Sequence, residues 1–215
     1  KKEHIDYITF SGSGEPTLHA RLGDIIKGIQ AMTHVPVAVL TNGSLLWQKE
    51  VRREVALADP VMPTLDAPDP ERFARINRPH SGITFTRLMS GLEAFRREYS
   101  GPYWLEVMLL DGYTTLDPQV QQLVEWVRRF RPDKVQLNTA ARPPAEEYAL
   151  AVPPERLAAI ALQFVPPAEV IAEHLSGRRS AHAAPSRRRI LDLLRRRPCT
   201  VEGVAHGLSL KVAEV

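Results

Sequence analysis

Short apolar runs alternate with segments of helical periodicity along most of this chain. Five runs rich in β-branched and aromatic residues have the length of strands: Ile5 to Phe10, Val35 to Leu40, Val61 to Leu65, Tyr103 to Leu110 and Lys134 to Leu137. Four of them have a proline near their start, where a missing N–H group does no harm to a sheet. Strands that alternate with helices predict a parallel sheet in an α/β fold.

Three of the segments between these runs carry apolar side chains on one helical face and charged side chains opposite. The apolar faces consist of Ile25, Ile26, Ile29 and Met32; of Leu88, Leu92 and Phe95; and of Val120, Leu123, Val124 and Val127. We expect these helices to cover the outer surface of the sheet.

Each predicted strand ends in polar or glycine-rich residues. These are the Ser11 to Glu15 segment, Thr41 to Ser44, Asp66, Asp111-Gly112 and Asn138-Thr139. In parallel α/β folds the carboxyl edge of the sheet is where ligands bind. Any one of these endings is also explained by the needs of a turn, but five together favour a composite site.

Side-chain alternation places polar residues on the face turned away from the helices. Trp104, Glu106 and Met108 share one face of their strand, and Gln136 and Asn138 share one face of theirs. A buried Glu106 requires either a structural partner or a ligand, and both remain open. Polar residues at such positions favour the inside of a partial barrel over a flat doubly wound sheet.

The strand and helix pattern weakens after Pro143-Pro144. A polar stretch at 176–186 predicts a linker, and Arg187 to Arg197 predicts a basic helix, followed by two short helices. We therefore expect a barrel domain over 1–167, a linker over 168–186, and the start of a helix-turn-helix or winged-helix-like module over 187–215.

Composition narrows the function classes. The chain has 215 residues, 44% hydrophobic and 25% charged, which fits a folded protein. No apolar run approaches the roughly 20 residues of a membrane helix, and the start has no apolar signal core, so we expect a cytoplasmic protein with no membrane partner. The start lacks Met and the end falls inside an apparent helix, which we interpret as a fragment cut at both ends.

Cysteine content and charge give two further limits. Cys199 is the one cysteine, so this chain cannot build a disulfide framework or a cysteine cage for a metal or cluster. The net charge of +3 is uneven, because residues 1–167 hold 19 Lys and Arg against 20 Asp and Glu, whereas residues 168–215 hold 9 against 5. The basic excess therefore lies in the C-terminal part.

The glycine-rich segment from Phe10 to Leu18 is the first candidate binding motif. A dinucleotide fingerprint would need a third glycine where Thr17 stands, and a phosphate-binding loop would need a lysine after Gly14. Neither nucleotide motif is present. A backbone that a ligand can approach closely, followed by Glu15 next to the rigid Pro16, suits a ligand ammonium group.

This motif, Ser13-Gly14-Glu15-Pro16, resembles the Gly-Gly-Glu-Pro type motif of the radical S-adenosylmethionine (SAM) enzymes. Further matches follow in the same order: Val39 to Gly43, Thr64 to Ala67, Arg75 to His80, Glu106 to Leu109, Gln136 to Thr139, and Arg142 to Pro144. The set covers residues 5 to 165 and is similar to the iron-sulfur oxidoreductase branch related to wyosine-tRNA synthesis enzymes.

The resemblance implies a partial (β/α)6-type barrel and two cofactors, SAM and a 4Fe-4S cluster. It implies that the cluster cleaves SAM to a 5'-deoxyadenosyl radical while the protein orients cofactor and substrate. The family's Cys-x3-Cys-x2-Cys loop is absent, and Ile5 to Phe10 matches the family's second strand. We therefore expect the cluster ligands upstream of Lys1, no metal ligand in this fragment, and no activity from the fragment alone.

The resemblance also assigns residues to the site. Within the cofactor-binding motif of Ser13, Gly14, Glu15 and Pro16, Gly14 and Glu15 would hold the methionyl amino group. Thr41, Asn42 and Asp66 would contact the methionyl or ribose parts, and Asn138 would be a further ribose or carboxylate contact. Asp66 and Asn138 equally suit turn and cap positions. Arg78, His80, Glu106 and Arg142 are the substrate candidates, and solvated loop charge is the alternative explanation for the first two and the last.

The substrate and the partners stay open at this point. A tRNA, a protein and a small molecule are all compatible with the family, although the net charge of −1 over the barrel part does not favour nucleic acid. A flavodoxin or ferredoxin is the expected electron donor, and the C-terminal module either binds nucleic acid or is a solvated helix. Two other classes remain: a cluster-free SAM-sensing DNA-binding regulator, and an ordinary α/β-barrel enzyme that uses Glu15, Asp66 or Glu106 as acid or base.

Overall fold

The described part of the chain contains six short strands and six α-helices, with one helix between most successive strands and two between the third and the fourth. The computed structural model describes residues 5–11, 14–140, 148–171, 190–191, 201 and 204–205. The strands are β1 (Ile8–Phe10), β2 (Val37–Thr41), β3 (Val61–Pro63), β4 (Trp104–Leu109), β5 (Lys134–Thr139) and β6 (Glu169–Val170). The helices are the 3-10 turn η1 (Pro16–Leu18), α1 (Leu22–Met32), α2 (Lys49–Val55), α3 (Pro70–Asn77), α4 (Phe85–Glu98), α5 (Asp117–Phe130) and α6 (Pro154–Ala161).

All strand pairs are parallel and follow the order of the chain. One three-stranded sheet has the order β1-β2-β3 and the other the order β4-β5-β6. Parallel bridges from Val61 to Tyr103 and from Thr64 to Glu106 connect β3 to β4. Sequential parallel order is that of a (β/α) barrel. Because no described pairing joins β1 to β6, these strands form an open partial barrel, as the sequence predicts.

Strand β6 lies inside the segment that the sequence predicts to be a linker, residues 168–186. Its residues Glu169 and Val170 pair with Gln136 and Leu137 of β5, and Ile171 donates a backbone hydrogen bond to Leu137. The sheet therefore extends past residue 167, and the predicted boundary is too early. The sequence does not predict β6, because this strand has only two residues and no run of β-branched or aromatic residues marks it. The predicted module over 187–215 lies outside the described residues, apart from five positions, and stays a prediction.

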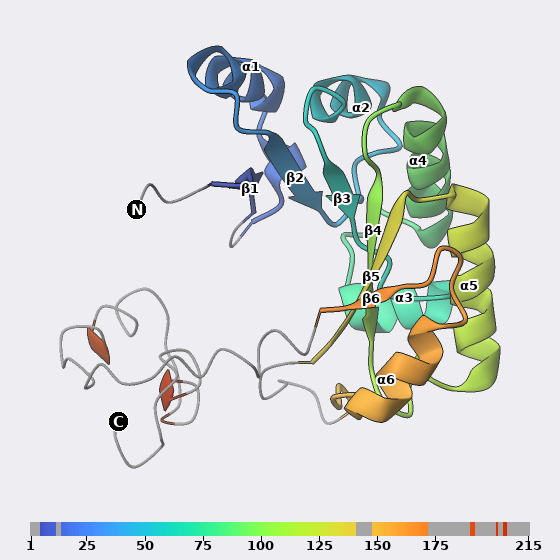
Figure 1. The fold of residues 1–215 in the computed structure, drawn as a ribbon. Coiled ribbons are helices and arrows are strands. Elements are labelled where there is room, and N and C mark those ends of the chain that lie inside the picture. Colours follow the sequence, from blue (N-terminus) through green and yellow to red (C-terminus); the bar gives the residue numbers. More distant parts are fainter. Residues whose placement is uncertain are drawn as a thin grey trace.

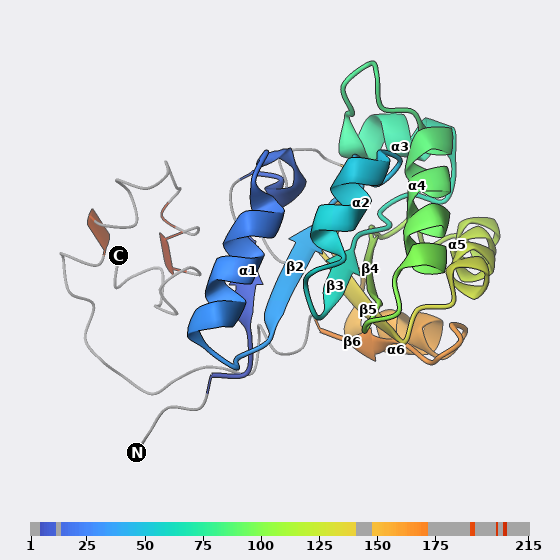
Figure 2. The ribbon, with the colours of Figure 1, turned by 90° about the horizontal axis from the view of Figure 1, so that it is seen from above.

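The helices lie along one side of the curved row of strands. In Figure 1, α1 and α2 lie beside β2 and β3, whereas α4 and α5 lie beside β4 and β5. Figure 2 shows the same helices following the curve of the strands from above. Helix α3 lies beyond the arrowheads of β2 and β3, at the carboxyl edge (Figure 1).

Burial alternates along β4 and β5 as the sequence predicts. Leu105 and Val107 of β4 and Leu137 of β5 are fully buried against the helix layer. Glu106 and Asn138 belong to the intervening half-buried positions. Side chains in a strand alternate between two faces, so these polar groups lie on the inner face of the partial barrel.

The buried face of α1 differs from the predicted one. Ile26 is fully buried and Leu22 is 2% exposed, but Ile25 is 38% exposed and Met32 is 83% exposed. The prediction of Ile25 and Met32 as core residues was therefore wrong. The core takes up Leu22 and Ile26, which lie at i, i+4 spacing, and the partly buried Ile29 packs against it.

Arg52 connects the loop after β2 to α4. Its guanidinium donates to both carboxylate oxygens of Glu98, at 2.8 and 2.9 Å, and to the carbonyl oxygens of Leu46 and Trp47. Only 8% of Arg52 is exposed, and its pairing with Glu98 raises the pKa of the guanidinium and lowers that of the carboxyl. The planar fork thus fixes the β2–α2 loop against the helix layer.

Gly91 has no side chain, so the backbone of the β2–α2 loop can pack directly against helix α4. This close packing leads to a prediction about stability. A Cβ atom on Gly91 would lie 2.5 Å from the backbone nitrogen of Trp47 and 2.8 Å from the carbonyl carbon of Leu46. We expect Gly91→Ala to lower the free energy of unfolding by about 1–3 kcal/mol, because the backbone must move. Gly28→Ala, in α1 with no atom within 4 Å of the new Cβ, should instead gain about 0.5–1 kcal/mol. Urea unfolding of both variants tests this, and equal effects would contradict it.

Candidate functional site

The carboxyl ends of the strands bring most of the predicted cofactor residues to one edge. Gly14 and Glu15 follow β1, Thr41 ends β2 and Asn42 follows it, and Asp66 follows β3. Asn138 lies at the end of β5, and Pro16 begins η1. Of the predicted residues, Ser13 and Arg142 lie outside the described residues.

Glu15 is the centre of a hydrogen-bond network, the Glu15 brace, which joins the first two strand ends. Its Oε1 accepts from the backbone nitrogen of Thr17 at 3.1 Å, the Thr17 hydroxyl at 2.7 Å and the Thr41 hydroxyl at 2.5 Å. Its Oε2 accepts from the backbone nitrogen of Asn42 at 2.8 Å. Both hydroxyls belong to buried residues. The carboxylate therefore holds the β1 and β2 loops together, and Oε2 keeps room for a further donor.

The loop after β2 is fixed by its own side chains. The Asn42 Oδ1 accepts from the backbone nitrogen of Ser44 at 2.9 Å, and the Thr41 hydroxyl accepts from that of Gly43 at 3.1 Å. Gly43 has a φ of 71°, in the left-handed region that glycine adopts most easily. Asn42 itself is exposed at this edge and accessible to a ligand.

Asp66 lies between the end of β3 and the last turn of α3. Its Oδ2 accepts from the side-chain amide of Asn77 at 2.9 Å. Burial raises the pKa of the Asp66 carboxyl to about 6, against the effect of the Asn77 hydrogen bond, and the negative charge of Glu106 adds to the rise. The Oδ1 of Asn77 is buried and has no hydrogen-bond partner among the described residues. A hydroxyl or amine on a ligand would satisfy that acceptor.

Glu106 and Asn138 form a pair across β4 and β5. The Asn138 side-chain amide donates to Glu106 Oε1 at 3.0 Å, while Asn138 Oδ1 accepts from the backbone nitrogen of Thr139 at 2.9 Å. The expectation of a partner for Glu106 is thereby met by a structural contact. Both residues are half-buried on the inner face, so they also remain within reach of a ligand there.

The loop between α3 and α4 carries the two other substrate candidates. Arg78 ends α3 with a φ of 45°, and His80 accepts a hydrogen bond at Nδ1 from the backbone nitrogen of Gly82 at 3.1 Å. Both side chains are exposed. Their loop starts beside Asn77, so it borders the same edge as Asp66.

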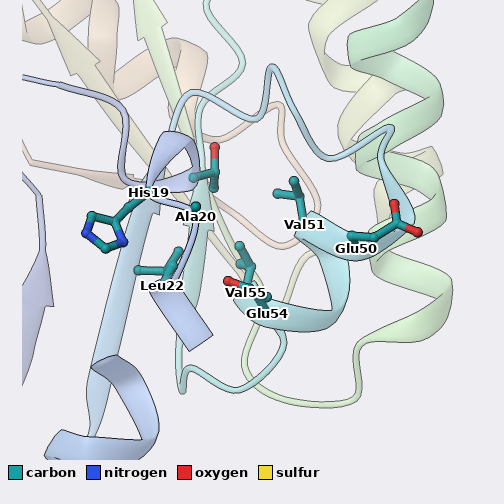
Figure 3. Close-up of a pocket in the computed structure, with 8 residues that line it drawn as sticks. His19, Ala20, Leu22, Glu50, Val51, Glu54 and Val55 are labelled. Carbon is teal, nitrogen blue, oxygen red and sulfur yellow. The ribbon is translucent and has the colours of Figure 1, made fainter. Parts of the chain in front are cut away.

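Two hollows lie beside the first strand end. One of about 300 Å³ is lined by Phe10, Ser11, Gly14, Glu15, Pro16, His19, Leu22 and Ile25. The other, of about 180 Å³, lies between the turn before α1 and helix α2, where Figure 3 shows His19 and Glu54 among the lining residues. Only the first contains predicted cofactor residues, so it is the better candidate for a ligand at the Glu15 brace.

Metal ligands and membrane spans give negative findings. Within residues 5–11, 14–140 and 148–171 and the few described positions beyond, no group of three or more His, Cys, Asp or Glu side chains could hold a metal ion. That this fragment supplies no metal ligand stays a prediction. No described helix is long and apolar enough to cross a membrane.

Thr17 and Asn77 are two residues of the site whose contacts the sequence does not predict. Thr17 supplies two of the four donors to Glu15, and Asn77 supplies the partner of Asp66. Thr17 directly follows the Gly-Glu-Pro motif, and Asn77 lies within the Arg75 to His80 segment that resembles the family. Their positions were therefore visible, but their partners depend on how two loops fold back, which no periodicity indicates.

Comparison with known proteins first gives a family match. The family model described as the Radical SAM superfamily matches residues 1–127, which is more than half of the chain. The match includes the Glu15 brace, Asp66 and Glu106. It ends before Asn138.

Three curated relatives extend this match. A protein named GTPase Obg from Brachyspira hyodysenteriae is 42% identical over 155 residues, covering 72% of this chain and 23% of that protein. A UPF0026 protein from Methanocaldococcus jannaschii is 34% identical over 146 residues, covering 68% and 45%. A probable GTP 3',8-cyclase from Methanocella arvoryzae is 28% identical over 124 residues, covering 58% and 38%. The chain thus spans less than half the length of these three relatives.

A solved structure shows the same fold. A domain of pyruvate-formate lyase-activating enzyme from Bacteroides vulgatus aligns with 76% of this chain and 96% of its own, with a TM-score of 0.59 and 19% identity. The agreement supports a parallel α/β partial barrel. None of the relatives named above bears on the wyosine branch, which stays a prediction.

Proposed function

Because this chain belongs to the radical SAM superfamily, we propose that its carboxyl edge supplies the amino-acid and ribose contacts for SAM in a full-length radical SAM enzyme. The observation that carries this proposal is the Glu15 brace. Four hydrogen bonds of 2.5 to 3.1 Å fix Glu15 between two strand ends, which preorganises the loop that a methionyl ammonium would contact.

The described residues fit the parts of SAM in different ways. The free capacity of Glu15 Oε2 and the exposed Gly14 backbone suit an ammonium group, which has only donors. The unpartnered Oδ1 of Asn77 and the carboxyl of Asp66 suit ribose hydroxyls, which donate as well as accept. Asn42 and Asn138 add amide groups at the same edge, for the cofactor's polar groups.

The residues of this chain do not fit a cysteine-bound cluster, because Cys199 is the one cysteine in the sequence. The chemistry that the superfamily's cofactors supply when bound is the one-electron cleavage of SAM to a carbon-centred radical. The contribution of this chain is to bind and orient SAM and to position the substrate. We assign the cluster ligands to residues outside it.

A prediction about this chain alone follows. Anaerobic reconstitution with iron and sulfide should leave it without a stable 4Fe-4S cluster, because it cannot supply three thiolates. Iron and sulfide analysis of the desalted protein, with electron paramagnetic resonance after reduction, measures this. Stoichiometric cluster in the chain would refute our assignment of the ligands.

For the substrate we propose a nucleic acid, with tRNA as the first candidate, and for the electron donor a flavodoxin or ferredoxin. The support for tRNA is the resemblance of the motif set to that of wyosine-tRNA synthesis enzymes. The name of the cyclase relative specifies GTP and so supports a nucleotide substrate in general. A nucleic-acid role for residues 187–215 is part of the same proposal and depends on their excess of arginine.

The decisive experiment uses the complete reading frame from which this chain comes. Under anaerobic reduction it should form 5'-deoxyadenosine from SAM, and replacement of Glu15 by Gln should suppress that product. A folded, cluster-loaded protein that forms none in the presence of a tRNA pool would contradict the proposed function.

A second candidate is acid-base chemistry at Asp66 without any cluster. The pKa of about 6 places this carboxyl in the range where a general acid or base works near neutral pH. Turnover of a substrate by cluster-free protein, lost in Asp66→Asn, would favour this candidate over the first.

A further inference from the structure

We propose that Arg75 and Arg87, here named the arginine rim, dock the phosphate groups of a nucleotide, either free or within RNA. The rim lies on α3 and on the first turn of α4. The inference rests on the proposed function, since it assigns the substrate side of the same carboxyl edge.

The first argument is a local concentration of positive charge. Residues 70–87 contain four arginines and one acidic residue, Glu71, although the barrel part as a whole is nearly neutral. Arg72 is already paired with Asp69 at 2.7 Å. Among the described residues, no carboxylate pairs with the guanidinium of Arg75 or Arg87, and both residues are exposed. This local excess of arginine is not apparent from the net charge of −1 over residues 1–167.

The second argument is the way in which aromatic rings hold these guanidinium groups. The central carbon of Arg75 lies 4.5 Å from the ring centroid of Tyr148 and 5.4 Å from that of Tyr113. That of Arg87 lies 4.8 Å from the ring of Trp47. A guanidinium held against a ring loses less freedom on binding, and its N–H groups can still form a fork with phosphate oxygens. Arg87 also donates from Nη1 to the Gly82 carbonyl oxygen, which leaves its remaining N–H groups for a phosphate.

The third argument is the position of the rim relative to the inner face. Asn77 lies between Arg75 and Arg78 in the sequence, and its side chain reaches Asp66 at the site. The last turn of α3 thus carries an exposed cation, Arg75, and an amide that is hydrogen-bonded to Asp66. Farther inside, Glu106 offers carboxylate oxygens, which accept hydrogen bonds from the N–H groups of a base. A nucleotide carries both an anionic and a hydrogen-bonding part, as this arrangement requires.

The test measures the binding of two probes, bulk tRNA and GTP, to the whole chain. We expect R75Q/R87Q to weaken the binding of at least one probe by about tenfold or more, and to reduce the salt slope for tRNA by about 2. A loss for tRNA alone identifies RNA as the source of the phosphate, and a loss for GTP alone identifies a free nucleotide. R75K/R87K keeps the charge but loses the fork, so it should bind at an intermediate level.

Two control variants make the result specific. R97Q/R128Q removes the same charge from exposed positions on α4 and α5 and should bind both probes as the wild type does. R187Q/R188Q/R189Q tests the basic C-terminal segment. Equal losses in the rim and the α4/α5 variants, a loss confined to the C-terminal variant, or no binding of either probe to the wild type would each overturn the proposal.

SAM affinity is measured in parallel for the same proteins. R75Q/R87Q should bind SAM as the wild type does, because neither arginine contacts the Glu15 brace or Asp66. Failure of the wild type to bind SAM would count against the proposed function, whereas the result with tRNA and GTP would still decide whether the rim binds phosphate.

Discussion

Replacement of Glu15 by Gln is expected to weaken SAM binding by about 10- to 100-fold, the largest effect of any single change at this site. The carboxylate accepts from four donors, on Thr17, Thr41 and Asn42. A glutamine amide must place an NH2 group against at least one of these donors, and it removes the charge that strengthens the others. Titration calorimetry with SAM measures the change.

Glu54→Gln is the matched control for this prediction. Glu54 also accepts a backbone hydrogen bond, from Gly23 at 3.0 Å, and lies in the hollow between η1 and α2, which Thr17 also lines, but it makes no hydrogen bond to Glu15, Thr41 or Asn42. Its SAM affinity should equal that of the wild type. Circular dichroism must show both variants to be folded at the titration temperature, and unchanged affinity in folded Glu15→Gln would contradict the role of the brace.

The second large effect concerns the dependence of stability on pH, through Asp66. Its pKa is about 6 in the folded chain against an ordinary value of 3.8. An acid whose pKa is raised by folding binds its proton more tightly in the folded state. Its contribution to stability is therefore complete below about pH 4 and is lost as the pH rises through about 6.

Asp66→Asn should remove this loss. Between about pH 4 and pH 8 the free energy of unfolding of the wild type should fall relative to that of the variant by up to about 3 kcal/mol, since one pKa unit corresponds to about 1.4 kcal/mol. Urea unfolding across this pH range measures the difference. Asp24→Asn, on the exposed face of α1, should follow the wild type, and parallel curves for Asp66→Asn and wild type would contradict the shifted pKa.

The sheet was the part of the fold that could be predicted most completely from the sequence. Its first five strands are short β-rich runs, and alternation along the strands placed Glu106 and Asn138 on one face. The two-residue β6 has no such run and was missed. The face of α1 was assigned wrongly at Ile25 and Met32, because the sequence shows which residues are apolar but not how much of a helix the sheet covers.

The site could be predicted as a set of residues but not as a set of contacts. The Gly14-Glu15-Pro16 motif and the strand ends indicated which residues meet at the carboxyl edge. That Glu15 binds Thr17 and Thr41, and that Asp66 binds Asn77, depends on loop conformations that bring together residues up to 26 positions apart. The aromatic support of Arg75 has the same origin, since Tyr113 and Tyr148 follow different strands.

The most direct test of the central claim is an assigned backbone amide NMR spectrum of this chain, titrated with SAM. We predict that the amides of Gly14, Asn42 and Gly43 shift together and saturate with one dissociation constant, whereas those at the opposite edge, such as Gly101 and Asp133, remain unchanged. Shifts confined to the hollow between η1 and α2, or no shifts at saturating SAM in a folded chain, would contradict a SAM site at the carboxyl edge.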